Sequence, residues 1–111
     1  MADKGFVYLP DIVGMVNIVP NGILSRTVSR TDKVTAVVFS FGAGQELSEH
    51  TSSKEAVLHF LRGEATVTLG KAAEGGETTA AKAGTVIRMR PGLPHSVYAD
   101  TDTLMLLSMM G

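Results

Sequence analysis

The apolar positions of this 111-residue chain are grouped in short runs rather than in helical stripes. No window carries apolar residues at i, i+3, i+4 and i+7 over three turns, so almost no helix is expected. Residues 34–41 (VTAVVFSF) and 57–61 (VLHFL) are apolar on both strand faces, which is typical of buried strands. Ala65, Val67 and Leu69 alternate with polar residues, which is the pattern of a half-exposed strand.

Turn residues separate these runs at short intervals, and later runs complete the series. Further strands are expected at residues 85–89, 96–99 and 103–109. Residues 71–82 (KAAEGGETTAAK) are the least apolar segment and predict an exposed hairpin. Many short strands with frequent turns indicate a sandwich or barrel, so the sequence predicts one all-β domain over residues 1–111.

Charge and composition narrow the classes of partner and compartment. The formal net charge is -1 and the chain has few aromatic residues, so nucleic acid is not an expected partner. Cysteine is absent, which removes disulfides, thiolate metal sites and cysteine nucleophiles and fits a reducing compartment. The N-terminus has no apolar run of signal-peptide length, and residues 12–24 are too short and too interrupted to span a bilayer. A cytoplasmic protein without membrane contact is therefore expected.

The last predicted strand has an apolar face that the core of one barrel does not cover. Residues 103–110 (TLMLLSMM) are apolar on both faces, and only one face can belong to a barrel core. A second subunit could cover the other face, and small domains gain from such burial, so a homodimer is predicted. The alternative is that N-terminal strands of the same chain cover that face.

Two glycine-bounded segments each carry a histidine. The first is residues 44–63 (GQELSEHTSSKEAVLHFLRG), with His50, and the second is residues 84–95 (GTVIRMRPGLPH), with His95. Both resemble the two motifs of the cupin family, with Gly44, His50 and Gly63 in register in the first and Gly84, Gly92 and His95 in register in the second. The resemblance implies an all-β, double-stranded β-helix (jelly-roll) barrel of cupin type.

In that family the motif histidines and a glutamate close a cage around a divalent metal. The resemblance therefore implies a metal site at His50 and His95 that could hold Mn, Fe, Ni or Zn. The two remaining ligand positions are occupied by Ser52 and Ala56, so the ligand set departs from the family's pattern. His59 is a third candidate ligand, although strand alternation from position 56 predicts that it faces away from the barrel interior.

Several further residues could contribute to a site. Ser52 could hydrogen-bond a ligand or a metal-bound water. Arg88 precedes His95 on the same predicted strand and loop, and an inward guanidinium would bind a carboxylate or phosphate. Tyr98 could be a proton donor or a packing residue. These three are the candidate substrate-binding residues. Oxygen ligands from carboxylates are also possible, and the candidates are Glu46, Glu49 and Glu55.

The sequence predicts a small-molecule-binding protein of cupin type with a divergent metal site centred on His50 and His95. Such a protein could be a metal-dependent enzyme, with the metal acting as a Lewis acid, but the sequence selects no reaction. One alternative is a metal-free barrel that acts as a ligand-binding or sensor module. Another is a metal-free isomerase or epimerase that uses His50 or His95 as a general base.

Overall fold

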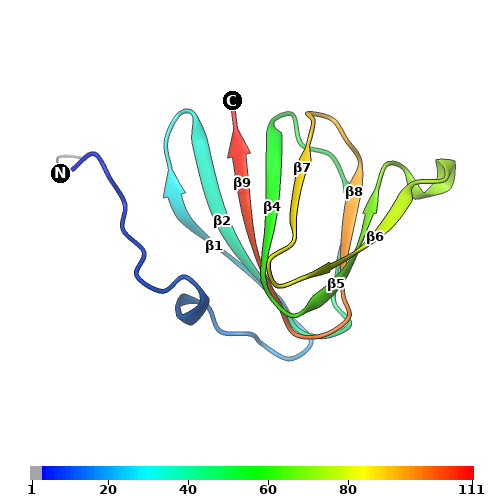
Figure 1. The fold of residues 1–111 in the computed structure, drawn as a ribbon, viewed down its shortest axis with the longest axis horizontal. Coiled ribbons are helices and arrows are strands. Elements are labelled where there is room, and N and C mark those ends of the chain that lie inside the picture. The colour runs from blue at the N-terminus through cyan, green and yellow to red at the C-terminus, as the bar shows by residue number, and fades with distance from the viewer. Residues whose placement is uncertain (1–3) are drawn as a thin grey trace.

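The computed structural model describes residues 4–111 and consists of two antiparallel sheets that face each other (Figure 1). The five-stranded sheet has the order β1 (Ile23–Arg30), β2 (Val34–Phe41), β9 (Thr103–Met110), β4 (Glu55–Arg62) and β7 (Val86–Met89). The four-stranded sheet has the order β3 (Glu46–His50), β8 (His95–Ala99), β5 (Glu64–Leu69) and β6 (Glu77–Lys82). Two single 3₁₀ turns, η1 (Val13–Met15) and η2 (Ala72–Glu74), are the helical elements of these residues. The predicted jelly-roll barrel is confirmed.

The core lies between the two sheets and follows from the alternation of side chains. On β4, Ala56, Leu58 and Phe60 are buried, while Val57 and His59 between them are only partly buried on the opposite face. One continuous apolar cluster joins both sheets, and its members are Phe41, Ala56, Leu58, Phe60, Ala65, Val67, Ala81, Met89, Val97, Ala99 and Met105.

Two strands lie outside the runs predicted from apolar pattern. β1 (Ile23–Arg30) is an edge strand with mostly exposed residues, so its sequence ILSRTVSR carries little apolar periodicity. β3 (Glu46–His50) is also an edge strand, and its burial pattern is almost wholly exposed. Backbone pairing rather than side-chain burial defines both strands. The predicted exposed hairpin does occur, since β5 and β6 pair across the turn that contains η2.

The segment before β1 covers part of the outer face of the five-stranded sheet. The Ser40 hydroxyl donates a hydrogen bond to the Asn17 carbonyl at 3.0 Å, and the Arg26 guanidinium donates to the Met15 carbonyl at 3.3 Å. Val38, on the same outer face as Ser40, is completely buried. We call residues 12–19 the strap. The chain itself therefore covers one end of the outer face, with a segment that contains η1 and no strand.

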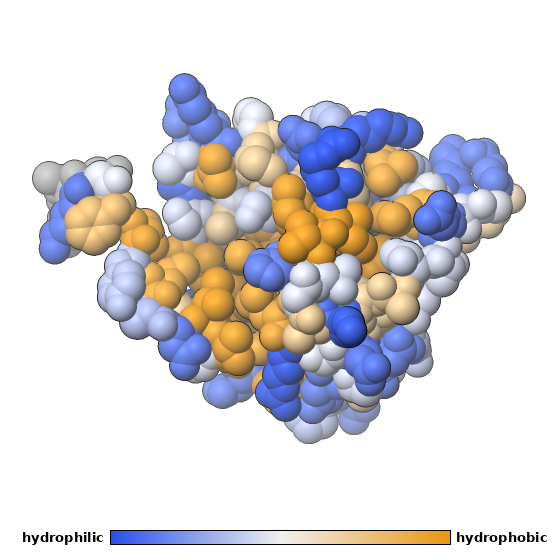
Figure 2. Space-filling model, in the orientation of Figure 1, coloured by the Kyte–Doolittle hydropathy of each residue, from blue (hydrophilic) through white to orange (hydrophobic). Residues whose placement is uncertain are grey.

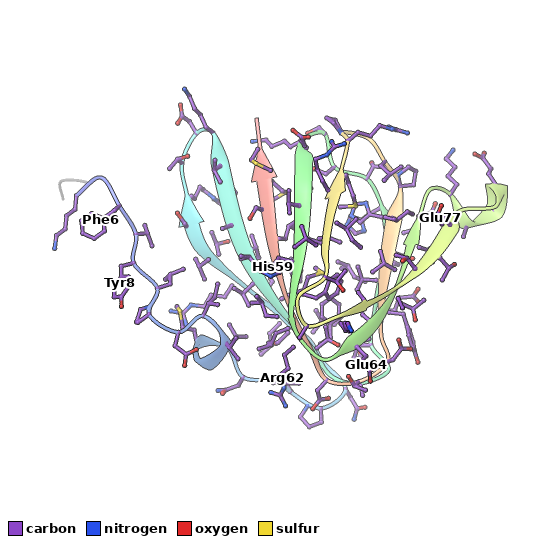
Figure 3. The ribbon with its side chains drawn as sticks, in the orientation of Figure 1. Phe6, Tyr8, His59, Arg62, Glu64 and Glu77 are labelled. Atoms are coloured by element: carbon purple, nitrogen blue, oxygen red, sulfur yellow. The ribbon has the colours of Figure 1, made fainter. Side chains whose placement is uncertain are left out.

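The residues before the strap run away from the barrel as an extended arm, residues 5–9 (Figures 1 and 3). Phe6 and Tyr8 on this arm are 69% and 76% exposed. Within residues 4–111, no helix has the length and apolar character needed to cross a bilayer.

Candidate functional site

The two motif histidines meet across a pair of neighbouring strands. His50 ends β3 and His95 begins β8, and the two residues are direct partners in the antiparallel ladder. Their ring centroids are 4.2 Å apart and the rings are tilted by 59°. His95 is buried, at 5% exposed, whereas His50 is exposed. The structure thus brings together two residues that are 45 positions apart in the sequence, and we call them the histidine pair.

Each imidazole of the pair is held by a backbone carbonyl two residues earlier in the chain. The Nδ1 of His50 lies 2.7 Å from the Ser48 carbonyl oxygen, and the Nδ1 of His95 lies 2.9 Å from the Leu93 carbonyl oxygen. A carbonyl oxygen only accepts, so Nδ1 carries the proton in both rings. In the neutral form of such a ring, Nε2 is unprotonated and able to bind a metal ion or accept a proton.

The loop that leads into His95 is fixed from two sides. The Gly92 amide donates to the Ser52 carbonyl at 2.7 Å, and the Gly70 amide donates to the Pro94 carbonyl at 2.7 Å. Gly92 has a φ of +79°, a conformation that a glycine adopts without steric cost. These contacts and the two prolines of the loop set the position at which the strand β8 starts, and hence the orientation of His95.

Burial changes the acidity of one member of the pair. Desolvation is the main cause that lowers the pKa of His95 below its ordinary value of 6.5, and the nearby His50 lowers it further. The hydrogen bond to the Leu93 carbonyl acts in the opposite direction because it favours the protonated ring. His95 is therefore neutral at pH 7, the form that a metal ligand or a general base requires.

The two positions at which the family pattern places further ligands do not supply them. Ala56 is 2% exposed and lies in the core, paired with Met89 on β7 and Met109 on β9. The hydroxyl of Ser52 accepts a hydrogen bond from the Lys54 amide at 3.1 Å, so it closes a local turn. Ser52 contributes to the site chiefly through its backbone carbonyl, which holds the loop before His95.

The three candidate carboxylates are engaged elsewhere. Glu55 pairs with Arg88 at 2.8 Å, and Glu49 accepts a hydrogen bond from the Ala72 amide at 3.1 Å. Glu46 is the ladder partner of Tyr98 on the outer face of the four-stranded sheet. In an unbroken strand Glu46 and His50, four residues apart, would lie on one face, but an irregularity in the pairing between positions 47 and 50 places them on opposite faces. No group of three His, Cys, Asp or Glu side chains suited to a metal occurs among residues 4–111.

The other predicted site residues lie away from the histidine pair. His59 is on the outer face of the five-stranded sheet, with Val86 and Leu106 as its ladder partners (Figure 3). Arg88 points to the same outer face, because the following residue, Met89, points into the core. Tyr98 is 42% exposed on the outer face of β8, since alternation turns its neighbours Val97 and Ala99 inward.

The backbone carbonyls of Ser48, Ser52 and Leu93 hold the histidine pair and the loop before His95 in place, and the sequence did not indicate these contacts. Each acts through its backbone oxygen, so the residue type carries no signal of the role. The Pro-Gly-Leu-Pro stretch before His95 was the one available clue, since it predicts a rigid approach to that ring.

The fold and the pair together define a small jelly-roll barrel with a two-histidine site at one edge strand. A scan of protein families matches residues 37–110 to the family described as Cupin domain. The chain therefore belongs to the cupin family.

Solved structures agree with this assignment. The chain is similar to a conserved protein of unknown function from Streptococcus pyogenes, with 31% identity, a TM-score of 0.81, and coverage of 95% of this chain and 88% of the other. An RmlC-like cupin from Desulfovibrio desulfuricans shows 25% identity, a TM-score of 0.81, and coverage of 95% and 97%. A variant of oxalate decarboxylase from B. subtilis shares the fold at 20% identity, with a TM-score of 0.73 and coverage of 86% and 27%. A comparison with curated protein sequences gives no significant match.

Proposed function

We propose that this cupin binds a small molecule at the histidine pair, through a divalent metal ion that His50 and His95 hold with open coordination positions. The observation that carries the proposal is the common arrangement of the two rings, each of which donates a hydrogen bond from Nδ1–H to a backbone carbonyl oxygen. That arrangement is the usual support of a metal-binding histidine, because it fixes the tautomer and leaves Nε2 for the metal.

The residues fit a divalent ion in part. Two neutral imidazoles suit Mn, Fe, Ni or Zn, with Zn and Ni favoured by nitrogen ligands. Protein side chains at Ser52 and Ala56 do not complete the set, so water and an oxygenated ligand such as an organic acid would occupy the remaining positions. A bound ion would supply Lewis-acid polarisation of such a ligand.

Metal titration of the chelator-treated protein tests this proposal. Isothermal titration with Zn²⁺, Ni²⁺ or Mn²⁺ should give one site per chain. His50→Ala and His95→Ala should each weaken binding by more than about tenfold, because each removes one of two side-chain ligands. His59→Ala is the matched control, since this histidine lies on the outer face of the other sheet, and it should bind as the wild type does.

A gain-of-ligand variant sharpens the same experiment. Ala56→Glu restores a carboxylate at the position where the family pattern has one, and metal should bind more tightly to this variant than to the wild type. In the absence of metal the variant should be less stable by about 2–4 kcal/mol, because the carboxylate is buried among Met89 and Met109. Metal binding that is undetectable, or equal in the wild type and both alanine variants of the pair, would overturn the proposal.

A second candidate function is metal-free acid–base chemistry, as in an isomerase or epimerase. It is favoured by the lowered pKa of His95, which results first from burial and keeps Nε2 available as a proton acceptor at neutral pH. A metal-free barrel that acts as a ligand-binding or sensor module is a separate alternative. Ligand-induced shifts of the His95 ring resonances in chelated protein would support metal-free ligand binding, which both alternatives require, and their absence across a panel of organic acids would count against both.

A further inference from the structure

One end of the barrel carries a groove whose two walls come from different parts of the chain. One wall is the turn between β5 and β6 (residues 69–77), and the other is the loop between β7 and β8 (residues 90–94) (Figure 1). The volume of the groove is about 520 Å³, which is in the range of small-molecule sites. Four of its lining residues are glycines, which leaves room between the walls. We call it the mouth groove.

Hydrogen bonds hold both walls in place. The Gly70 amide donates to the Pro94 carbonyl at 2.7 Å and so joins the turn to the loop. The turn is also fastened to β3, because the Ala72 amide donates to the Glu49 carboxylate at 3.1 Å. Walls that are fixed in advance reduce the cost of ordering them when a ligand binds.

The mouth groove carries one unpaired charge of each sign. Lys71 and Glu74, which are 4.0 Å apart on the turn, balance each other. Glu77 belongs to the turn wall and Arg90 to the loop wall, and neither has an ion-pair partner within 4.0 Å among residues 4–111. The Arg90 guanidinium donates one hydrogen bond, at 3.0 Å, to the Pro91 carbonyl. Its other N–H groups remain as donors for a ligand.

Glu77 lies on the inner face of the four-stranded sheet. It is the ladder partner of Leu69, which pairs with His95, so Glu77 lies in the same row of the sheet as the histidine pair. Alternation along β6 agrees, because Ala81, four residues later, is buried in the core. Figure 3 shows Glu77 on the β5–β6 hairpin, and Figure 2 shows that this end of the molecule is mostly hydrophilic, unlike the apolar middle of the view.

We propose that the mouth groove binds a small zwitterion of the amino-acid class, with its carboxylate on Arg90 and its ammonium group on Glu77. A guanidinium matches a carboxylate through paired N–H donors, and a carboxylate accepts hydrogen bonds from an ammonium group. The apolar part of the lining, from Leu69, Leu93 and Pro94, gives a short aliphatic stem a surface to contact. A ligand with a single charge would leave the opposite charge of the groove unmatched.

This site is separate from the proposed metal site, because the groove residues are distinct from His50 and His95. Binding of a zwitterion is therefore measured on chelated protein, and its result does not depend on whether the histidine pair holds a metal ion. His50→Ala should bind the zwitterion as the wild type does.

Isothermal titration of the chelated full chain tests the proposal with a series of ω-amino acids from glycine to ε-aminohexanoate. Each amino acid is compared with the carboxylic acid and the amine of the same chain length, such as γ-aminobutyrate with butyrate and butylamine. At the length that binds best, the zwitterion should bind about fivefold or more tightly than either single-charge probe. The reason is that each single-charge probe lacks one charge-assisted hydrogen bond.

Two variants assign the charges. Glu77→Gln should bind the zwitterion no more tightly than the carboxylic acid, and Arg90→Gln should bind it no more tightly than the amine. Both side chains are exposed, so the barrel should keep its circular dichroism spectrum and its cooperative unfolding.

Glu46→Gln and Arg88→Gln are the matched controls. They make the same changes on the outer faces of the two sheets and should keep the preference for the zwitterion. Equal affinity for the zwitterion and the single-charge probes at every length would overturn the proposal, as would undetectable binding of the whole series. A loss of affinity in Arg88→Gln equal to that in Arg90→Gln would also contradict it.

Discussion

Burial holds His95 in its neutral form, and this has a consequence for stability. Desolvation, and to a smaller extent the nearby His50, lower the pKa of His95 below the ordinary value of 6.5, which an unfolded chain regains. As the pH falls below 6.5 the unfolded state therefore binds a proton before the native state does. The contribution of His95 to the free energy of unfolding is complete above pH 6.5 and is lost progressively as the pH falls toward the lower native value.

Urea unfolding of chelated protein at about pH 7.5 and about pH 5.5 measures this dependence, since carboxylates titrate mainly at lower pH. His95→Gln should lose less stability than the wild type between the two values, whatever its stability at neutral pH. His50→Gln removes only the smallest of the contributions to the shift and should keep most of the dependence. An equal loss in the wild type and in His95→Gln would contradict the prediction.

The residues of the site differ in how far the sequence could place them. His50 and His95 were identified because glycines and prolines at fixed positions mark the turns around them. Arg88 and Tyr98 were candidates by proximity in sequence, but alternation along β7 and β8 turns both outward. The direction of a side chain depends on strand register, and a single irregularity, as between Leu47 and His50, reverses it.

At the scale of the elements, the turn between β4 and β5 is fixed by close packing against the start of β9. Gly63 has a φ of +89°, and a Cβ atom there would lie 2.7 Å from the Thr103 hydroxyl and still closer to the Asp102 carbonyl oxygen. Thr103 cannot move away easily, because its hydroxyl is hydrogen-bonded to the carbonyls of Glu64 and Thr101. Gly63→Ala should therefore combine backbone strain with a steric clash.

Gly84 provides a matched control for this substitution. It has a φ of +98°, but a Cβ atom there would meet nothing within 4 Å. Gly84→Ala should cost about 1–2 kcal/mol from the backbone conformation alone. Gly63→Ala should cost at least about 2 kcal/mol more, because the contact with β9 adds to the strain. Urea unfolding of both variants gives the comparison, and equal costs would show that the β4–β5 turn can shift away from β9.

Apolar pattern predicted those strands that bury at least one face, such as β2 (Val34–Phe41) and β9 (Thr103–Met110). It did not predict β1 (Ile23–Arg30), because most of its side chains are exposed and its position depends on hydrogen bonds to β2. An edge strand is fixed by its backbone hydrogen bonds to the neighbouring strand rather than by an apolar periodicity of its own sequence. The same reason applies to β3, the strand that carries His50.

At the scale of the whole molecule, residues 5–19 divide into two parts with different physical roles. The strap (residues 12–19) accepts hydrogen bonds from the side chains of Ser40 and Arg26, so it belongs to the folded barrel. The arm exposes Phe6 and Tyr8, so it adds little to the stability of one chain. Both parts lie on the same face of the five-stranded sheet, and no apolar periodicity distinguishes them.

Two truncations separate these roles. Deletion of residues 1–8 should change the free energy of unfolding by no more than about 0.5 kcal/mol, because the side chains of residues 4–8 are exposed in one chain. Deletion of residues 1–20 should cost about 3 kcal/mol or more, since it removes the strap from the outer face and leaves Ser40, which is 1% exposed, without its acceptor. Both are measured by urea unfolding at a concentration where sedimentation shows a monomer, because dimerisation adds stability of its own. If the shorter deletion already unfolds the isolated chain, the arm contributes to the stability of the monomer, which would contradict the small role assigned to it here.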